Sequence, residues 1–184
     1  MNSRLHSTLF LSISLFIGAA QLHAADLTFY AGGVKPGSLS YNDVKTSLDS
    51  SPIFGVRFST NFVPLFGMEH TLAFSSDYLF PQSIAAVKNA KGFVYNSNLI
   101  FNLPVGIAVP YLTAGAGLVH QYGDPSLPIG TKFALNYGGG LKFPHLAGPL
   151  GLRFDVRGYR AGFVSNTLNI LEVSGGILLS IGTK

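Results

Sequence analysis

Residues 120–126 bring an imidazole, a carboxylate and a hydroxyl close together in the sequence, as His120, Asp124 and Ser126. A histidine that takes the proton of a nearby serine hydroxyl can turn that hydroxyl into a nucleophile. The spacing does not select this chemistry, because Gln121 and Tyr122 follow the histidine directly. We interpret His120 as an interfacial side chain with an apolar body and a polar tip, and we predict no catalytic residue.

The remaining histidines and glycines do not form a cofactor or metal site. His70, His120 and His145 fall on different predicted elements, without acidic neighbours at the spacing of metal ligands. The chain contains no Cys, which excludes disulfides and thiolate ligands. The glycines at 138–140 precede no predicted helix, so they lack the helix N-terminus that a phosphate-binding loop requires. We therefore predict neither a metal nor a cofactor.

The most regular pattern of charge lies in residues 151–159, GLRFDVRGY. There Arg153, Asp155 and Arg157 alternate with three apolar residues, Leu152, Phe154 and Val156. Successive side chains of a β-strand point to opposite faces, so this strand would carry three charges on one face and only apolar groups on the other. Such a strand separates a polar environment from an apolar one.

Residues 1–24 have the organisation of a secretory signal peptide. Arg4 precedes an apolar run at 9–20, and the small residue Ala24 stands at the predicted cleavage site. The apolar run is too short to span a bilayer. We predict an exported mature chain, residues 25–184, that forms one domain.

The composition of the chain limits the folds and surroundings in which it can be stable. Charged residues make up 11% and hydrophobic residues 47% of the sequence, yet no second run is long enough for a membrane helix. A closed β-sheet in an outer membrane is one of the few forms open to such an exported chain. The net charge is +4 and the basic residues are scattered, which argues against nucleic-acid binding because that requires a basic patch.

Eight segments show the two-residue period of a strand whose faces meet different surroundings: 27–34, 53–60, 67–76, 93–102, 109–119, 132–143, 150–159 and 169–181. Long polar connections at 35–50, 77–91, 121–130 and 160–168 alternate with short ones that contain Pro. Outer-membrane barrels have long external loops, short periplasmic turns and an even number of strands. The predicted fold is all-β, an eight-stranded antiparallel up-and-down transmembrane barrel.

The polar faces of these strands should point into the barrel. They are rich in small residues, which suit the narrow interior of an eight-stranded barrel, whereas a charge on the lipid face would cost about 2–4 kcal/mol. The predicted interior charges are Arg57, Glu69, Arg153, Asp155, Arg157 and Glu172. A last turn centred near residues 164–165 predicts a Glu172–Arg157 ion pair, and a turn centred at Val63 predicts a Glu69–Arg57 pair. These pairs would close the interior.

Aromatic residues gather around the short connections and predict a girdle at one membrane interface: Phe58, Phe62, Phe66, Phe101, Tyr111 and Phe143.

Four segments, PYLTAGAGL (110–118), NYGGGLKF (136–143), LRFDVRGY (152–159) and VSGGILLSI (173–181), resemble the small outer-membrane β-barrel family related to OmpA, OmpX and OmpW. The resemblance covers essentially the whole mature chain. It implies outer-membrane localisation and an assembly signal, recognised by the barrel assembly machinery, at Ser174, Gly176, Leu179 and Ile181. The chain departs from the family where it ends on Lys184 rather than on an aromatic residue.

The sequence leaves three functions open. The first is a non-enzymatic barrel that supports the envelope or makes surface contacts, with membrane lipid as its surroundings. The second is a narrow channel or a carrier of small hydrophobic molecules, which an interior cavity lined by Tyr30, Val94 and Ile170 would favour. The third is an enzyme that modifies lipid; barrels of this kind that deacylate lipid A carry Ser two residues after the His, and Tyr122 stands at that position. We predict a monomer, because closure removes the free sheet edges.

Overall fold

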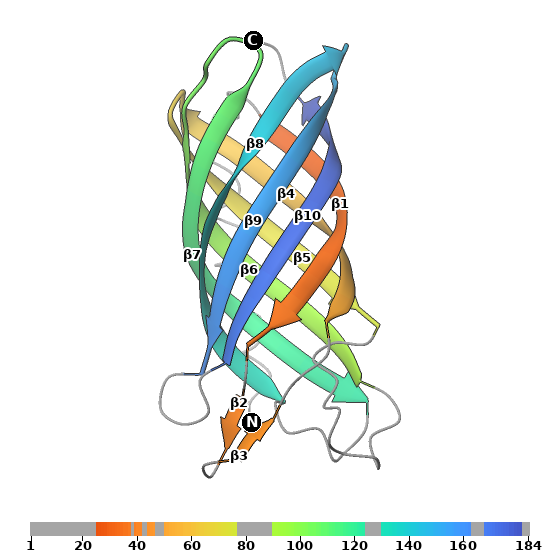
Figure 1. Ribbon diagram of the computed structural model, residues 1–184. Helices are drawn as coiled ribbons and strands as arrows, with labels where there is room; N and C mark the ends of the chain where they lie inside the picture. The colour runs from red at the N-terminus through yellow and green to blue at the C-terminus, as the bar shows by residue number, and fades with distance from the viewer. Residues whose placement is uncertain are drawn as a thin grey trace, which may run out of the picture.

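The computed structural model describes residues 25–37, 39–41, 44–46, 50–76, 90–123, 130–162 and 168–181. Eight of its strands form one closed barrel (Figure 1). They are β1 (Ala25–Pro36), β4 (Ser51–Val63), β5 (Phe66–Ser75), β6 (Ala90–Asn102), β7 (Val109–Gly123), β8 (Thr131–Ala147), β9 (Leu150–Ala161) and β10 (Leu168–Ile181). The predicted signal peptide lies outside the described residues.

The predicted fold class is confirmed, and each predicted barrel strand falls on one observed strand, within a residue at its ends or inside it. The difference lies in the predicted connection 35–50. It contains two short strands, β2 (Leu39–Tyr41) and β3 (Val44–Thr46), which form a separate antiparallel pair beyond one end of the barrel (Figure 1).

The barrel closes because β1 pairs on both sides. Ala25 lies opposite Ile181 of β10 and opposite Thr60 of β4, and every neighbouring pair around the ring is antiparallel. Each barrel strand therefore has two partners, and no long edge is left to recruit another strand.

The alternation in the sequence becomes an inside-out distribution of side chains. On β9, Arg153, Asp155 and Arg157 point inward with at most 2% of their surface exposed. The intervening Leu152, Phe154 and Val156 point outward and are 42–52% exposed. The outer surface of the barrel is therefore apolar while its centre is charged, the reverse of the arrangement in a protein surrounded by water.

The connections differ at the two ends of the barrel. At one end, here called the turn end, short connections join β4 to β5, β6 to β7 and β8 to β9. Gly148 in the last of these has a φ of 62°, a left-handed conformation that favours glycine. The opposite end, which carries the longer connections and the β2–β3 pair, is called the loop end (Figure 1). No described segment is a helix of the length and apolarity needed to cross a membrane.

A candidate functional site in the barrel interior

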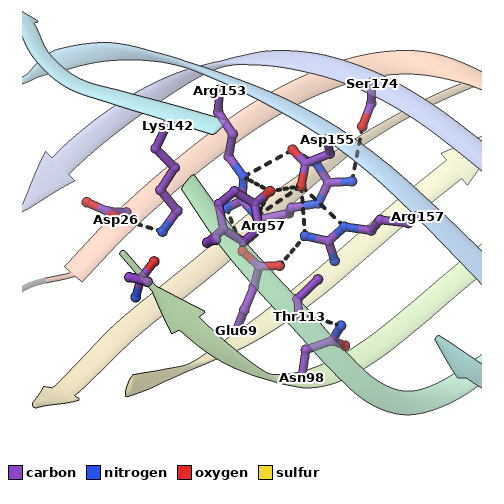
Figure 2. A network of polar contacts seen from close by, with 12 residues as sticks. Asp26, Arg57, Glu69, Asn98, Thr113, Lys142, Arg153, Asp155, Arg157 and Ser174 are labelled. Carbon is purple, nitrogen blue, oxygen red and sulfur yellow. Dashed lines mark hydrogen bonds and ion pairs between the residues drawn. The ribbon is translucent and has the colours of Figure 1, made fainter. Parts of the chain in front are cut away.

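The six charged residues predicted for the interior meet at its centre. Figure 2 shows this network around Arg57, Glu69 and Asp155. They come from four strands: Arg57 from β4, Glu69 from β5, Glu172 from β10, and Arg153, Asp155 and Arg157 from β9. All six are at most 2% exposed. Three guanidinium groups and three carboxylates balance one another in charge, as buried ionic groups require.

Asp155 is the centre of this ion-pair network. Its carboxylate accepts hydrogen bonds from Arg57 Nη1 at 2.9 Å, from Arg153 Nε at 3.0 Å and from Arg157 Nη2 at 3.0 Å. The Tyr111 hydroxyl donates a further hydrogen bond to it. Charge-assisted bonds of this kind are roughly twice as strong as neutral ones, so Asp155 couples all three arginines.

The two glutamates complete the network from opposite sides. Glu69 accepts hydrogen bonds from Arg153 Nη1 and Arg157 Nη2, both at 2.5 Å, and so bridges two arginines of β9. Glu172 accepts hydrogen bonds from Arg57 Nη2, from the Ser174 hydroxyl at 2.9 Å and from the Tyr159 hydroxyl at 2.7 Å.

Neither predicted ion pair forms. Glu172 does lie opposite Arg157 in the β9–β10 register, as predicted, but its carboxylate binds Arg57 of β4, the strand on the other side of β1. The Glu69–Arg57 prediction was wrong in register, because the turn lies at Pro64 and Leu65 and a bulge follows Asn61. Arg57 therefore lies opposite Thr71, and Glu69 opposite Ser59.

Tyrosines were missed as members of the network. Tyr111, expected in the outer girdle, points inward and accepts hydrogen bonds from Arg153 Nε at 3.0 Å and Nη2 at 2.8 Å. The ring centroid of Tyr30 lies 3.5 Å from Arg57 Cζ, a cation–π contact. The alternation along the strands carried the signal, since Tyr111 is two residues from the inward-facing Thr113 and Tyr159 is two from Arg157.

The rest of the predicted girdle faces outward. Phe66 and Phe101 pack on neighbouring strands with ring centroids 5.1 Å apart. Phe58 and Phe62 are also exposed on the outer surface, and Phe143 is half-buried.

Glycines of the barrel wall make room for the large interior side chains. A Cβ at Gly140 would lie 2.5 Å from the Tyr111 hydroxyl, and one at Gly138 would lie 3.1 Å from Arg157 Cγ and 2.3 Å from the Val156 carbonyl oxygen. The run 138–140 thus allows close approach of neighbouring groups, as its place in a strand suggests.

Two further layers flank the network along the barrel. Toward the loop end, buried apolar side chains form a cluster that includes Tyr30, Val94 and Ile170. Toward the turn end, Lys142 Nζ and Asp26 Oδ2 form an ion pair at 3.3 Å. The six charges thus lie between an apolar layer toward the loop end and an ion pair toward the turn end.

The histidines lie apart from one another. His120 Nδ1 is 2.7 Å from the Thr131 hydroxyl, and the His120 ring stacks on Tyr122 with 5.6 Å between centroids. His70 Nδ1 is 3.2 Å from the Tyr95 hydroxyl on the outer surface. Asp124 and Ser126 lie outside the described residues. Within the described ranges, no three His, Cys, Asp or Glu side chains come together to hold a metal ion.

The residues of the implied assembly signal lie on β10. Ser174 is buried and donates to Glu172, whereas Ile181 is exposed on the outer surface and Leu179 is half-buried. At Gly176 a Cβ would lie 2.4 Å from the Phe29 carbonyl oxygen, so the β1–β10 contact itself requires glycine. Recognition by the assembly machinery stays a prediction.

No family model matches the sequence, and no curated protein matches it either. Among solved structures, the chain is similar to Neisserial surface protein A, with a TM-score of 0.66, 15% identity, and coverage of 85% of this chain and 97% of that one. For the outer membrane protein OprG from Pseudomonas aeruginosa the TM-score is 0.61, the identity 14%, and the coverages are 87% and 97%. For the outer membrane enzyme PagL these values are 0.52, 13%, 85% and 99%.

The structural similarity establishes a shared fold, whereas sequence identities this low leave the activity open, since one of these proteins is an enzyme. The chain has the closed, eight-stranded antiparallel barrel fold of the small outer-membrane proteins.

Proposed function

We propose that this protein is a non-enzymatic integral barrel of the outer membrane that supports envelope structure or makes surface contacts. The observation that carries the proposal is the inside-out distribution of side chains, with an apolar outer surface around a buried network of six charges. Lipid is the surrounding that stabilises such a surface, because it removes the apolar groups from water without requiring polar partners.

The network favours a closed interior over an open channel. Asp155 binds all three arginines, and each glutamate binds an arginine as well, so an ion that entered the centre would have to separate oppositely charged groups. Breaking a buried pair leaves a charge without compensation, which costs several kcal/mol. The side chains therefore act as a plug.

A narrow channel or a carrier of small hydrophobic molecules is the first alternative. Tyr30, Val94 and Ile170, whose side chains would line its path near the loop end, belong to the buried apolar cluster. The second alternative is an enzyme that modifies lipid, as the fold is shared with PagL. In the described part of the chain, His120 contacts Thr131 and Tyr122 rather than a carboxylate.

The deciding experiment is single-channel conductance of refolded residues 25–184 in a planar bilayer, with a heat-modifiability gel to prove that the barrel is folded. We expect a folded barrel without steady conductance. Glu69→Gln and Glu172→Gln test the network, and Lys91→Gln on the outer surface is the matched control. Steady conductance of the unsubstituted barrel that rises further in Glu69→Gln and Glu172→Gln, but not in Lys91→Gln, would show that the interior is a channel and not a plug.

A silent barrel still requires a test for lipid chemistry. Vesicles containing lipid A and phospholipid should show no new deacylated product when incubated with the folded protein. Product formation that is lost in His120→Ala would establish the enzyme instead.

A further inference from the structure

The turn end of the barrel exposes apolar side chains where a water-facing tip would carry polar ones. Val105 and Ile107, in the connection between β6 and β7, are 67% and 75% exposed, the highest fractions among the large apolar side chains of the described residues. Val63 and Leu65 are exposed in the β4–β5 turn, and Leu146 beside the β8–β9 turn. A surface of this kind on a soluble tip marks a contact with a partner or a membrane.

Charge is missing from the same three segments. Residues 61–68, 103–110 and 143–152 contain no Lys, Arg, Asp or Glu. Their one titratable side chain, His145, has Nδ1 3.2 Å from the Gly148 carbonyl oxygen. Nothing in these segments is suited to a charged partner.

Several backbone groups of the turns are paired within the protein. Val105 and Ala108 exchange hydrogen bonds of 2.8 and 3.1 Å, and Leu103 N donates to the Pro110 carbonyl oxygen at 2.8 Å. Asn102 N donates to the Leu65 carbonyl oxygen at 2.7 Å. Proline, which has no N–H to satisfy, occurs in all three segments, at 64, 104, 110, 144 and 149. Internal pairing of this kind is what a low-dielectric surrounding demands of a backbone.

The loop end has the opposite character. Outward-facing polar side chains border the apolar surface there: Lys35, Lys91, His120, Thr131, Arg160 and Asn169. At the turn end the apolar surface instead continues through Phe62, Phe66 and Phe101 onto the turns. The turns therefore belong to the same surface as the lipid-facing wall.

From these observations we infer that the turn end is embedded in the membrane, at the boundary between the acyl chains and the phospholipid headgroups of the leaflet that it reaches. The partner of this surface is lipid, and the inference rests on the proposed membrane location. From Phe133 to Phe143, β8 advances by about 10 residues of about 3.3 Å each, which at a tilt of roughly 40° spans roughly 25 Å. About ten residues of the strand thus fill the hydrocarbon layer, and the uncharged residues 144–147 of β8 lead from its border to the turn.

Three single-cysteine variants along one segment test this depth, because the chain has no cysteine of its own. Lys91→Cys lies at the loop end of β6, Leu99→Cys three residues before the strand ends at Asn102, and Ile107→Cys in the following turn. Each is labelled with an environment-sensitive fluorophore and refolded into phosphatidylcholine vesicles. Quenching is measured with phosphatidylcholine brominated near the glycerol end of its acyl chains, and with aqueous iodide.

We expect brominated lipid to quench the probes at 99 and 107, and iodide to quench mainly the probe at 91. If the probe at 99 is reached by iodide rather than by lipid, the membrane location itself is wrong. If lipid quenches the probe at 99 but iodide quenches the one at 107, only the inference about the turns fails.

A second change separates the effect of the turn from that of the dye. Val105→Asp in the Ile107→Cys background should raise iodide quenching severalfold, whereas Val105→Leu should leave it unchanged. Equal quenching in both would mean that the dye alone holds the tip in lipid, and would overturn the inference.

Discussion

At the scale of single residues, the ion pair between Glu172 and Arg57 depends most on one partner. Glu172 has no other cation within 4 Å among the described residues, since the remaining hydrogen bonds to its carboxylate come from Ser174 and Tyr159. Arg57→Met leaves a buried carboxylate without its counterion. We expect the free energy of unfolding to fall by about 3–5 kcal/mol. Urea unfolding in vesicles, followed by circular dichroism, measures the change.

The matched control is Arg160→Met, which removes an exposed arginine from β9 and should change the free energy by no more than about 0.5 kcal/mol. Adding Glu172→Gln to Arg57→Met should restore part of the loss, because the uncompensated charge is gone. Equal effects of Arg57→Met and Arg160→Met would contradict the role of Arg57.

Gly117 tests how tightly the barrel wall is packed. A Cβ there would lie 1.9 Å from the Tyr95 carbonyl oxygen and 2.5 Å from Asn96 Oδ1, so Gly117→Ala must displace the neighbouring strand. We expect a loss of about 1–3 kcal/mol. A Cβ at Gly33 would meet no neighbouring group within 4 Å, so Gly33→Ala should be neutral or slightly stabilising in the same unfolding experiment.

At the scale of the elements, the registers of the strands decide which charges meet. In the β4–β5 hairpin, a turn one residue later than predicted replaces Arg57 by Ser59 as the residue opposite Glu69. Arg57 and Ser59 both face inward, because a shift of the turn centre by one residue changes the partner of Glu69 by two residues. Direction is therefore a more robust property of a strand than its pairing.

The pairing of β1 with β10 closes the barrel and can be tested by crosslinking. Phe29 lies opposite Ile177, and both are exposed on the outer surface. Opposite residues have Cα atoms roughly 4.5–5.5 Å apart, within the range of a disulfide. The variant Phe29→Cys with Ile177→Cys should oxidise readily and change its mobility on a non-reducing gel.

The control for this crosslink is Phe29→Cys with Val173→Cys, since Val173 lies opposite Gly33. This pair should remain reduced in the folded barrel. Preferential oxidation of the control would mean that β10 is displaced along β1.

At the scale of the whole molecule, closure determines the state of association. Each barrel strand is paired on both sides, so the barrel leaves no sheet edge for a second copy. We expect residues 25–184 to be a monomer in detergent. Light scattering coupled to size-exclusion chromatography measures the protein mass in the micelle. A mass of two chains at low protein concentration would show that an outer face, and not a strand edge, makes a specific contact.

The sequence by itself determined the strands and their faces. A two-residue period is a local property, so residues such as Arg153, Asp155 and Leu152 report their direction without knowledge of their neighbours. The same period explains why six charges could be assigned to the interior. Tyr111 was assigned to the outer girdle because it lies near a turn, although its position in the alternation along β7 indicates the inward face.

Only the tertiary structure decided which charges bind one another. Arg57 reaches Glu172, 115 positions away in the chain, because closure of the ring places β4 and β10 on either side of β1, with both side chains turned into a narrow interior. Contacts between strands that are not neighbours depend on the stagger of every strand in the ring, and a local sequence pattern does not contain that information. The apolar surface of the turn end likewise depends on the tertiary structure, because the fold brings three separate connections to the same end of the barrel.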